Sequence, residues 1–129
     1  MRLLVDTHAL LWWVTSGGSR LSVQARDLLS DSSTDALVGA GSLYEIAYKS
    51  SIGRLQLPGR PEAYLPRLLR RHAFAVLPIA DVHAIHAGGL PLIHRDPWDR
   101  LLVAQAQVES LPILTTDPAI GQYDVDVIW

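Results

Sequence analysis

The stretch His94–Ala106, HRDPWDRLLVAQA, has the pattern of a helix start followed by an apolar helix body. Asp96 is placed to cap this helix, because its carboxylate can accept hydrogen bonds from the free N–H groups of the first turn. Pro97 suits the first helical position, where no N–H is needed. A second carboxylate, Asp99, follows three residues after Asp96. Taken alone, Asp99 is explained as a favourable negative charge at the start of the helix dipole.

Length and composition predict one domain, residues 1–129. A chain of 129 residues with 49% hydrophobic residues is long enough to form a real core. It has no cysteine, which excludes a disulfide framework and a thiolate metal site. The apolar N-terminus is interrupted by Asp6 and His8, and no run is long enough to cross a bilayer. We therefore expect a soluble, cytoplasmic protein.

Charge is distributed unevenly along the chain, although the formal net charge is only −2. Between Lys49 and Arg71 six basic residues face a single acid, Glu62, whereas no Lys or Arg follows Arg100. The net charge argues weakly against a nucleic-acid partner, but its distribution predicts a basic side and an acidic side. Ordinary solvated faces are the alternative.

Short apolar runs alternate with helical patterns. Strands are expected at Leu3–Asp6, Ala36–Val38, Ala73–Leu77, Pro112–Thr116 and Val125–Trp129. Helices are expected at His8–Thr15, around Leu21–Leu29, at Ser42–Ser51, from Pro61 or Pro66, at Asp81–Ala87 and at Pro97–Ser110. Runs that are apolar on both faces are typical of buried parallel strands. This order predicts an α/β fold, a three-layer α/β/α sandwich on a mostly parallel sheet of about five strands.

Five acids come at places that such a fold brings together. Asp6 closes the first strand and Asp117 closes the fourth, while Asp96 and Asp99 begin the helix that leads into the fourth strand. Glu45 lies one turn into the helix that follows the second strand. Sites in open parallel sheets lie beyond the carboxyl ends of the strands. We therefore expect all five acids to face one edge of the sheet.

A cluster of acids needs an explanation, because like charges about 5 Å apart repel by roughly 3 kcal/mol at an effective dielectric constant near 20. A divalent cation would offset this repulsion. Oxygen ligands without His or Cys favour Mg²⁺ or Mn²⁺ over Zn²⁺. The chain has no GxGxxG after its first strand and no GxxxxGK[ST], so dinucleotide and P-loop sites have no motif support.

Three patterns that could belong to a functional site can also be explained by structure alone. Glu45 and Lys49 are four residues apart, the spacing of a surface ion pair on a helix. His83 and His86 are three apart, a spacing that can bind metal, but no third ligand is nearby and we expect surface histidines. Asp96 and Asp99 can be a capping pair alone.

Four segments in order carry a resemblance to a known family. They are LLVDTHALLWW, SLYEIAYKSSIGRLQLP, HRDPWDRLLVAQA and ILTTD, and together they extend over nearly the whole chain. The chain resembles PIN-domain ribonucleases, specifically the VapC-type toxins of bacterial toxin–antitoxin pairs. The resemblance implies a Mg²⁺- or Mn²⁺-dependent endoribonuclease that cleaves structured RNA such as tRNA or rRNA. It also implies a homodimer and inhibition by a small cognate antitoxin that inserts a segment into the active-site groove.

The family's site residues are carried over by motif. The four acids that the resemblance implies as catalytic metal ligands are Asp6, Glu45, Asp99 and Asp117. Asp96 is then first a helix cap beside the site, and Thr7 or Thr116 would orient a carboxylate or a water. Candidates for holding the RNA backbone are Lys49, His94, Arg95 and Arg100. Trp98 stands where this subgroup more often has Phe, and the run Gly39-Ala40-Gly41 is richer in glycine than usual.

Two other functions belong to different classes. A catalytically silent module would keep the fold to bind RNA or an antitoxin, but a decayed site tends to lose acids and this set is complete. A Mg²⁺-dependent phosphoryl-transfer domain would use Asp6 as a nucleophile. Such enzymes usually carry a second acid two positions later, where this chain has His8.

Overall fold

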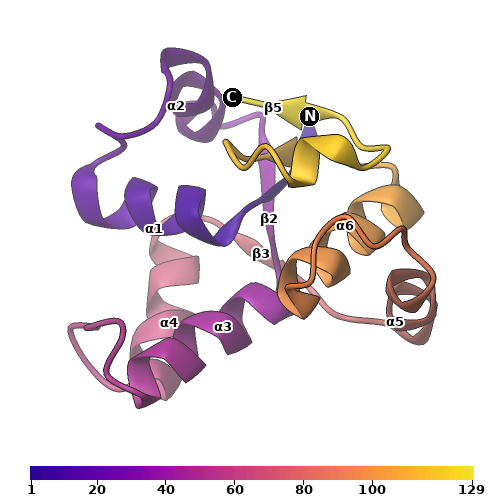
Figure 1. Cartoon of the computed structure of the whole chain (residues 1–129). Coiled ribbons are helices and arrows are strands. Elements are labelled where there is room, and N and C mark those ends of the chain that lie inside the picture. Colours follow the sequence, from indigo (N-terminus) through magenta and orange to yellow (C-terminus); the bar gives the residue numbers. More distant parts are fainter.

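The apolar runs form one five-stranded sheet in which every neighbouring pair of strands is parallel. The strands are β1 (Arg2–Val5), β2 (Asp35–Gly39), β3 (Ala75–Leu77), β4 (Ile113–Leu114) and β5 (Val127–Ile128). Their order in the sheet is β3-β2-β1-β4-β5 (Figure 1), in a computed structural model that describes all residues from 1 to 129. The predicted sheet is confirmed, and its terminal strand is parallel as well.

Six helices cover the two faces of the sheet. They are α1 (Thr7–Ser16), α2 (Val23–Ser30), α3 (Ala40–Ser51), α4 (Pro61–Arg71), α5 (Asp81–Gly88) and α6 (Pro97–Glu109), with a short 3₁₀ turn at Ile120–Gln122. The first four pack on one face, and α5 and α6 pack on the other (Figure 1). The three-layer α/β/α sandwich is therefore confirmed. No helix is long and apolar enough to cross a membrane.

The two faces of the central strand belong to two separate cores. Leu3 and Val5 of β1 pack with α1 to α4, whereas Leu4 between them packs with α5 and α6. All three side chains are completely buried. Because successive side chains of a strand point to opposite faces, a strand covered on both sides must be apolar at every position. This explains the unbroken apolar run before Asp6.

The start of α6 is built as the sequence predicts. The Asp96 carboxylate accepts hydrogen bonds from the N–H groups of Trp98 and Asp99, at 2.8 and 3.4 Å, and Pro97 takes the first helical position. The helix ends at Ser110, whose φ of 54° turns the chain toward β4. These caps fix which residues of the first turn face the sheet edge.

The helix α3 begins two residues earlier than predicted, immediately after β2. Glu45 consequently lies on its second turn rather than its first. The junction requires Gly39, because a Cβ there would lie 2.7 Å from the amide oxygen of the buried Gln105 side chain. The Gln105 amide in turn donates to the carbonyls of Leu77 and Pro78. The glycine-rich run therefore makes room for a buried amide.

Two other predictions change in detail. The basic helix begins at Pro61, and Pro66 lies inside it. The prediction of two surface histidines on α5 is wrong for His83, which is 2% exposed, and right for His86. The ring of His83 accepts a hydrogen bond from the Ala80 N–H and lies 2.9 Å from a Glu109 oxygen on α6. Only His83 and Ala87 of α5 are buried, and the polar contact of the His83 ring with Glu109 helps to attach this short helix to α6.

Candidate active site

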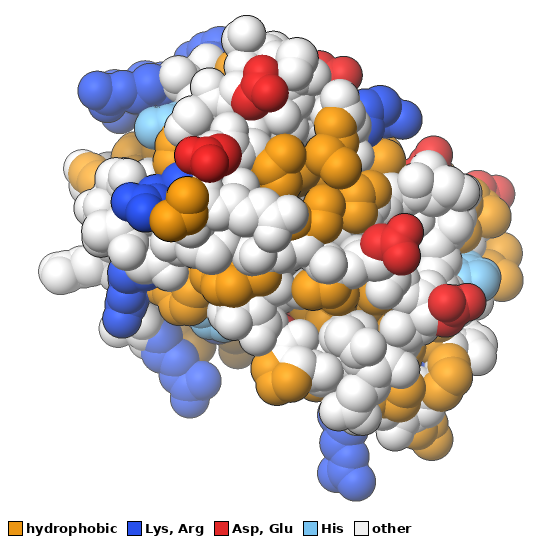
Figure 2. Space-filling model, turned by 90° about the horizontal axis from the view of Figure 1, so that it is seen from above, with side chains coloured by type: hydrophobic (Ala, Val, Ile, Leu, Met, Phe, Trp, Pro, Cys, Tyr) orange, Lys and Arg blue, Asp and Glu red, His pale blue; other side chains and the backbone are white.

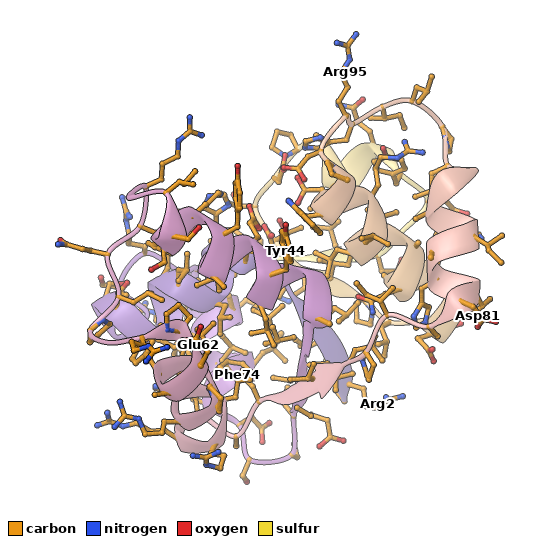
Figure 3. The ribbon with its side chains drawn as sticks, turned by 90° about the horizontal axis from the view of Figure 1, so that it is seen from below. Arg2, Tyr44, Glu62, Phe74, Asp81 and Arg95 are labelled. Atoms are coloured by element: carbon orange, nitrogen blue, oxygen red, sulfur yellow. The ribbon has the colours of Figure 1, made fainter.

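The predicted acids gather at the edge where the parallel strands end. Asp6 directly follows β1, and Asp117 comes after its neighbour β4. Asp99 lies on the first turn of α6 and Glu45 lies on α3. The chain leaves β1 toward β2 on one side, while β4 lies on the other, so this is the switch point of the sheet. Figure 3 looks onto this edge, between α3 and the start of α6.

Asp6 is buried and held by a hydroxyl. The Thr115 Oγ1 donates a hydrogen bond of 2.8 Å to the Asp6 carboxylate and accepts one of 3.0 Å from the Asp117 N–H. Burial raises the pKa of Asp6, although the hydrogen bond from Thr115 opposes this effect. One threonine therefore links the ends of β1 and β4 and sets the spacing of their two acids.

Asp99 is the most perturbed acid of the site. Burial, then the negative charges of Asp96, Asp6 and Glu45, raise the pKa of Asp99 to about 7. Such a value reports that the carboxylates lie close enough to repel one another in a partly desolvated place. Near neutral pH the Asp99 carboxyl therefore keeps a proton in part of the molecules. A bound cation would balance the same negative charge without that proton.

His94 lies among these acids. Its Nε2 is 3.0 Å from Asp99 Oδ2 and 3.7 Å from Asp117 Oδ2. Its Nδ1 accepts a hydrogen bond of 3.1 Å from the Asp96 N–H, so Nδ1 carries no proton. The proton of the neutral ring must then be on Nε2, which donates to Asp99. The backbone N–H of His94 donates to the Tyr123 hydroxyl, which fixes the ring's position.

Glu45 forms the ion pair with Lys49 that the sequence predicts and also lies with the acids of the site. The ion pair with Lys49 is present, with 2.8 Å between Nζ and Oε2. However, Glu45 is 7% exposed, whereas a surface pair would leave both partners in water. On the same turn of α3 the buried Ser42 accepts a hydrogen bond from the Thr7 hydroxyl. Polar groups of α1 and α3 thus meet beneath Glu45, on the site's side of the helix.

The donor set of this edge fits a hard divalent cation. Four residues offer carboxylate oxygens, the ligands that Mg²⁺ and Mn²⁺ prefer. The oxygens of Asp99 and Asp117 and the His94 nitrogen lie within 4.8 Å of one another. Burial raises the pKa of both Asp6 and Asp99, and neighbouring carboxylates add to this effect, so a cation here would meet poorly solvated negative charges. Asp99 and Asp117 are the acids whose oxygens lie this close together, and Asp6 and Glu45 are near enough for their charges to raise the pKa of Asp99.

The sequence model of the PIN domain family matches residues 3–126, nearly the whole chain. The chain belongs to the PIN domain family. No curated protein matches the chain in sequence. The predicted resemblance is thus confirmed at the level of the family.

Solved structures with the same fold come from toxin–antitoxin complexes. A chain of the DNA-bound VapBC complex of Salmonella typhimurium is 17% identical, with a TM-score of 0.71 over 99% of this chain and 97% of that one. A chain of VapBC2 from Rickettsia felis, bound to a promoter DNA fragment, is 12% identical, with a TM-score of 0.69 over 99% and 98%. A chain of a toxin–antitoxin complex from Klebsiella pneumoniae is 16% identical, with a TM-score of 0.66 over 98% of this chain and 96% of that one. At these identities the likeness shows the fold of this PIN domain.

Two predicted threonine roles change in the PIN domain's structure. Thr115, not Thr116, holds Asp6, and Thr116 is exposed. The two threonines directly follow β4, and in extended chain neighbouring side chains point in opposite directions, so a shift of one residue exchanges the two. The Thr7 hydroxyl donates to Ser42 instead, and the Thr7 backbone N–H acts on Asp6 only by lowering its pKa. The TTD pattern marks this pair of threonines but leaves the choice between them open.

The four basic candidates separate into different roles. Arg100 lies away from the acids, because its guanidinium donates to the carbonyls of Ala87, Leu90 and Pro91 and so holds the segment after α5. Arg95 is exposed and extends outward from the loop before α6 (Figure 3). Lys49 pairs with Glu45, and His94 joins the acid cluster. The expectation of a cluster without histidine is therefore wrong, since the His94 ring contacts Asp99.

Proposed function

We propose that this PIN domain is a metal-dependent endoribonuclease of the VapC toxin type that cleaves structured cellular RNA such as tRNA or rRNA in the cytoplasm. The observation that carries the proposal is the gathering of Asp6, Glu45, Asp99 and Asp117 at the carboxyl edge of the sheet of a PIN domain, where burial and neighbouring carboxylates raise the pKa of Asp99. A site that repels its own charges in this way is suited to Mg²⁺ or Mn²⁺ and to a phosphate.

Each residue has a defined part in the proposed reaction. Asp6, Glu45, Asp99 and Asp117 would hold the ion, which when bound supplies an activated water and a positive charge for the leaving oxygen. Thr115 keeps Asp6 and Asp117 in register, and the Nε2–H of His94 orients the Asp99 carboxylate. These supports matter because such a site needs its carboxylates fixed before the substrate arrives.

The RNA backbone would be held by basic residues outside the cluster. Arg95 is free to reach a phosphate, and Lys49 lies at the rim, beside Glu45. Arg100 is withdrawn from this role because its guanidinium is already bonded to backbone carbonyls. Phosphate contacts of this kind give orientation and affinity without reading sequence.

An antitoxin protein is the partner that we propose, by analogy with the toxin–antitoxin complexes that share the fold. An apolar hollow between α3 and α4 would receive an apolar helix of such a partner, and its lining includes Leu43, Ala47, Leu65, Pro66 and Leu69. We also propose a homodimer, which would join the basic segments of two chains. A monomer at micromolar concentration in light scattering would contradict the dimer.

The test of the activity is cleavage of total RNA by the purified, antitoxin-free chain with Mg²⁺ or Mn²⁺. We expect discrete fragments that disappear with EDTA and with Asp6→Asn. The matched control is Asp124→Asn, an exposed acid that is not among the carboxylates acting on Asp99, and it should cleave like the parent. Wild-type cleavage by Asp6→Asn would overturn the assignment. No cleavage by well-folded protein would favour the silent binding module instead.

A further inference from the structure

Three aromatic side chains form a continuous row beside the acid cluster. Tyr44 and Tyr48 lie one turn apart on α3, with ring centroids 6.2 Å apart and planes only 11° from parallel. Trp98, at the start of α6, lies 4.4 Å from the Tyr44 ring, between centroids. Tyr44 is 54% exposed and Tyr48 is 50% exposed. The row therefore joins two helices across the site and presents ring surface to solvent.

Two rings of this row are sequence neighbours of acids in the cluster. Tyr44 directly precedes Glu45, and Trp98 directly precedes Asp99. Neighbouring residues of a helix point about 100° apart, so each ring lies beside its acid rather than over it. In Figure 3 Tyr44 lies between α3 and the start of α6, at the same gap where the acids gather. A molecule whose phosphate reached the acids would extend its neighbouring groups over these rings.

The row has no role in the core that would explain it. Both tyrosines face water although the same helix buries Ile46 completely. The ring-to-ring contacts and the support from Trp98 hold the tyrosines in place before any partner arrives, which lowers the entropic cost of binding. Aromatic rings beside a basic residue, here Lys49 after Tyr48, are the usual platform for bases of single-stranded nucleic acid.

We propose that Tyr44 and Tyr48, backed by Trp98, form a stacking surface for unpaired nucleobases next to the scissile phosphate. The proposal rests on the proposed nuclease function and adds to it a preference for substrate. Bases in a duplex are already stacked on one another, whereas bases in loops and single strands are free to stack on protein rings. Tyr44 and Tyr48 would therefore hold the unpaired bases that flank the cleaved bond.

The test separates binding from cleavage. A fluorescein-labelled, ten-nucleotide oligouridylate is titrated in the Asp6→Asn background with Mg²⁺, and its anisotropy gives the Kd. A second probe has the same backbone but abasic sites at its central positions. Tyr44→Leu removes the ring and keeps apolar volume, and Tyr44→Phe restores the ring. Ile85→Ser, an exposed apolar residue on α5, is the control. Circular dichroism confirms the fold of each variant.

We expect Tyr44→Leu to weaken binding of the oligouridylate about tenfold, within the range measured for one stacked base. Tyr44→Phe should restore most of this loss, and the abasic probe should bind the parent and Tyr44→Leu alike. Equal affinity of the parent and Tyr44→Leu for the oligouridylate would overturn the proposal. So would an equal loss with Tyr44→Phe, or an equal effect of Tyr44→Leu on both probes.

The cleavage arm uses the unmodified site with Mg²⁺. Tyr44→Leu should raise KM for the oligouridylate with little change in kcat, because the ring binds the base and does not touch the reacting atoms. A fall in kcat with constant KM would contradict the stacking role. If the parent chain cleaves nothing, the proposed nuclease function fails, while the binding arm still reports separately on the stacking surface.

Discussion

Two histidines of this PIN domain have the same local arrangement and different surroundings. The Nδ1 of His83 accepts a hydrogen bond from the Ala80 N–H, as the Nδ1 of His94 does from the Asp96 N–H. In each ring Nε2 lies about 3 Å from one carboxylate, at 2.9 Å for Glu109 and 3.0 Å for Asp99. The ring tautomer is thus set in the same way at both places.

The surroundings differ in the number of acids. The side chain of Glu109 is 36% exposed, and it stands alone beside His83. Around His94 the Asp99 carboxylate also feels Asp96, Asp6 and Glu45, and Asp117 lies 3.7 Å from the ring. The face of the molecule shown in Figure 2 is opposite to that of Figure 3, and its acidic side chains are scattered singly. A histidine–carboxylate pair is therefore structural or functional according to what else faces it.

The two histidine–carboxylate pairs should differ most in RNA cleavage when the acid of each pair, Asp99 or Glu109, is neutralised. Asp99→Asn should lower RNA cleavage at least about 100-fold, because it removes a ligand from the proposed cation site. Glu109→Gln should cleave at the parent rate, since Glu109 lies in the α5–α6 contact. Initial rates with Mn²⁺ measure both. Equal rates for the two variants would remove the functional distinction between the pairs.

The histidine of the cluster should come next in effect. His94→Ala should lower metal affinity or kcat about 10- to 100-fold, the usual consequence of losing a group that orients a metal ligand. His94→Gln, which places an N–H donor near Asp99, should recover part of the loss. A calorimetric titration with Mn²⁺ separates affinity from turnover. Full activity in His94→Ala would show that the ring does not position Asp99.

The cluster should also make the metal-free protein less stable as pH rises. The pKa of Asp99 in the folded chain is about 7, above the ordinary value of 3.8, so the folded state keeps a proton that the unfolded chain has lost. The free energy of unfolding should therefore fall by up to about 3 kcal/mol between pH 4 and pH 7. Urea unfolding in EDTA measures this slope. Asp99→Asn should flatten it, and an unchanged slope would contradict the assignment.

The smallest effect on cleavage should come from removing the ring of His83, which pairs with Glu109. His83→Ala should lower the free energy of unfolding by about 2 kcal/mol, because it empties a buried site and leaves the Ala80 N–H without its partner. Cleavage per folded molecule should not change. Urea unfolding and initial rates on the same sample test the two statements. A loss of activity without a loss of stability would place His83 in the site.

Much of this molecule could be predicted from local patterns. Unbroken apolar runs gave the parallel strands, and their ends placed Asp6 and Asp117 at one edge. Asp96 and Pro97 predicted the start of α6. These signals lie within a few residues of each other, so a sequence displays them directly.

Contacts between distant segments could not be predicted in the same way. The hydrogen bond from Thr115 to Asp6 joins residues 109 positions apart and depends on the direction in which the first side chain after β4 points. His94 resembled a phosphate-binding residue because the turn that points its ring back at Asp99 has no sequence signature. His83 was taken for a surface residue because its partner, Glu109, lies on another helix.

The most direct test of the account is Mn²⁺ binding, followed by the loss of the free-ion signal in electron paramagnetic resonance. We predict saturable binding by the parent chain and by His83→Gln, and at least about tenfold weaker binding by Asp99→Asn. Saturable binding of equal strength in Asp99→Asn and the parent would contradict the claim that the carboxyl edge of the sheet is the metal centre.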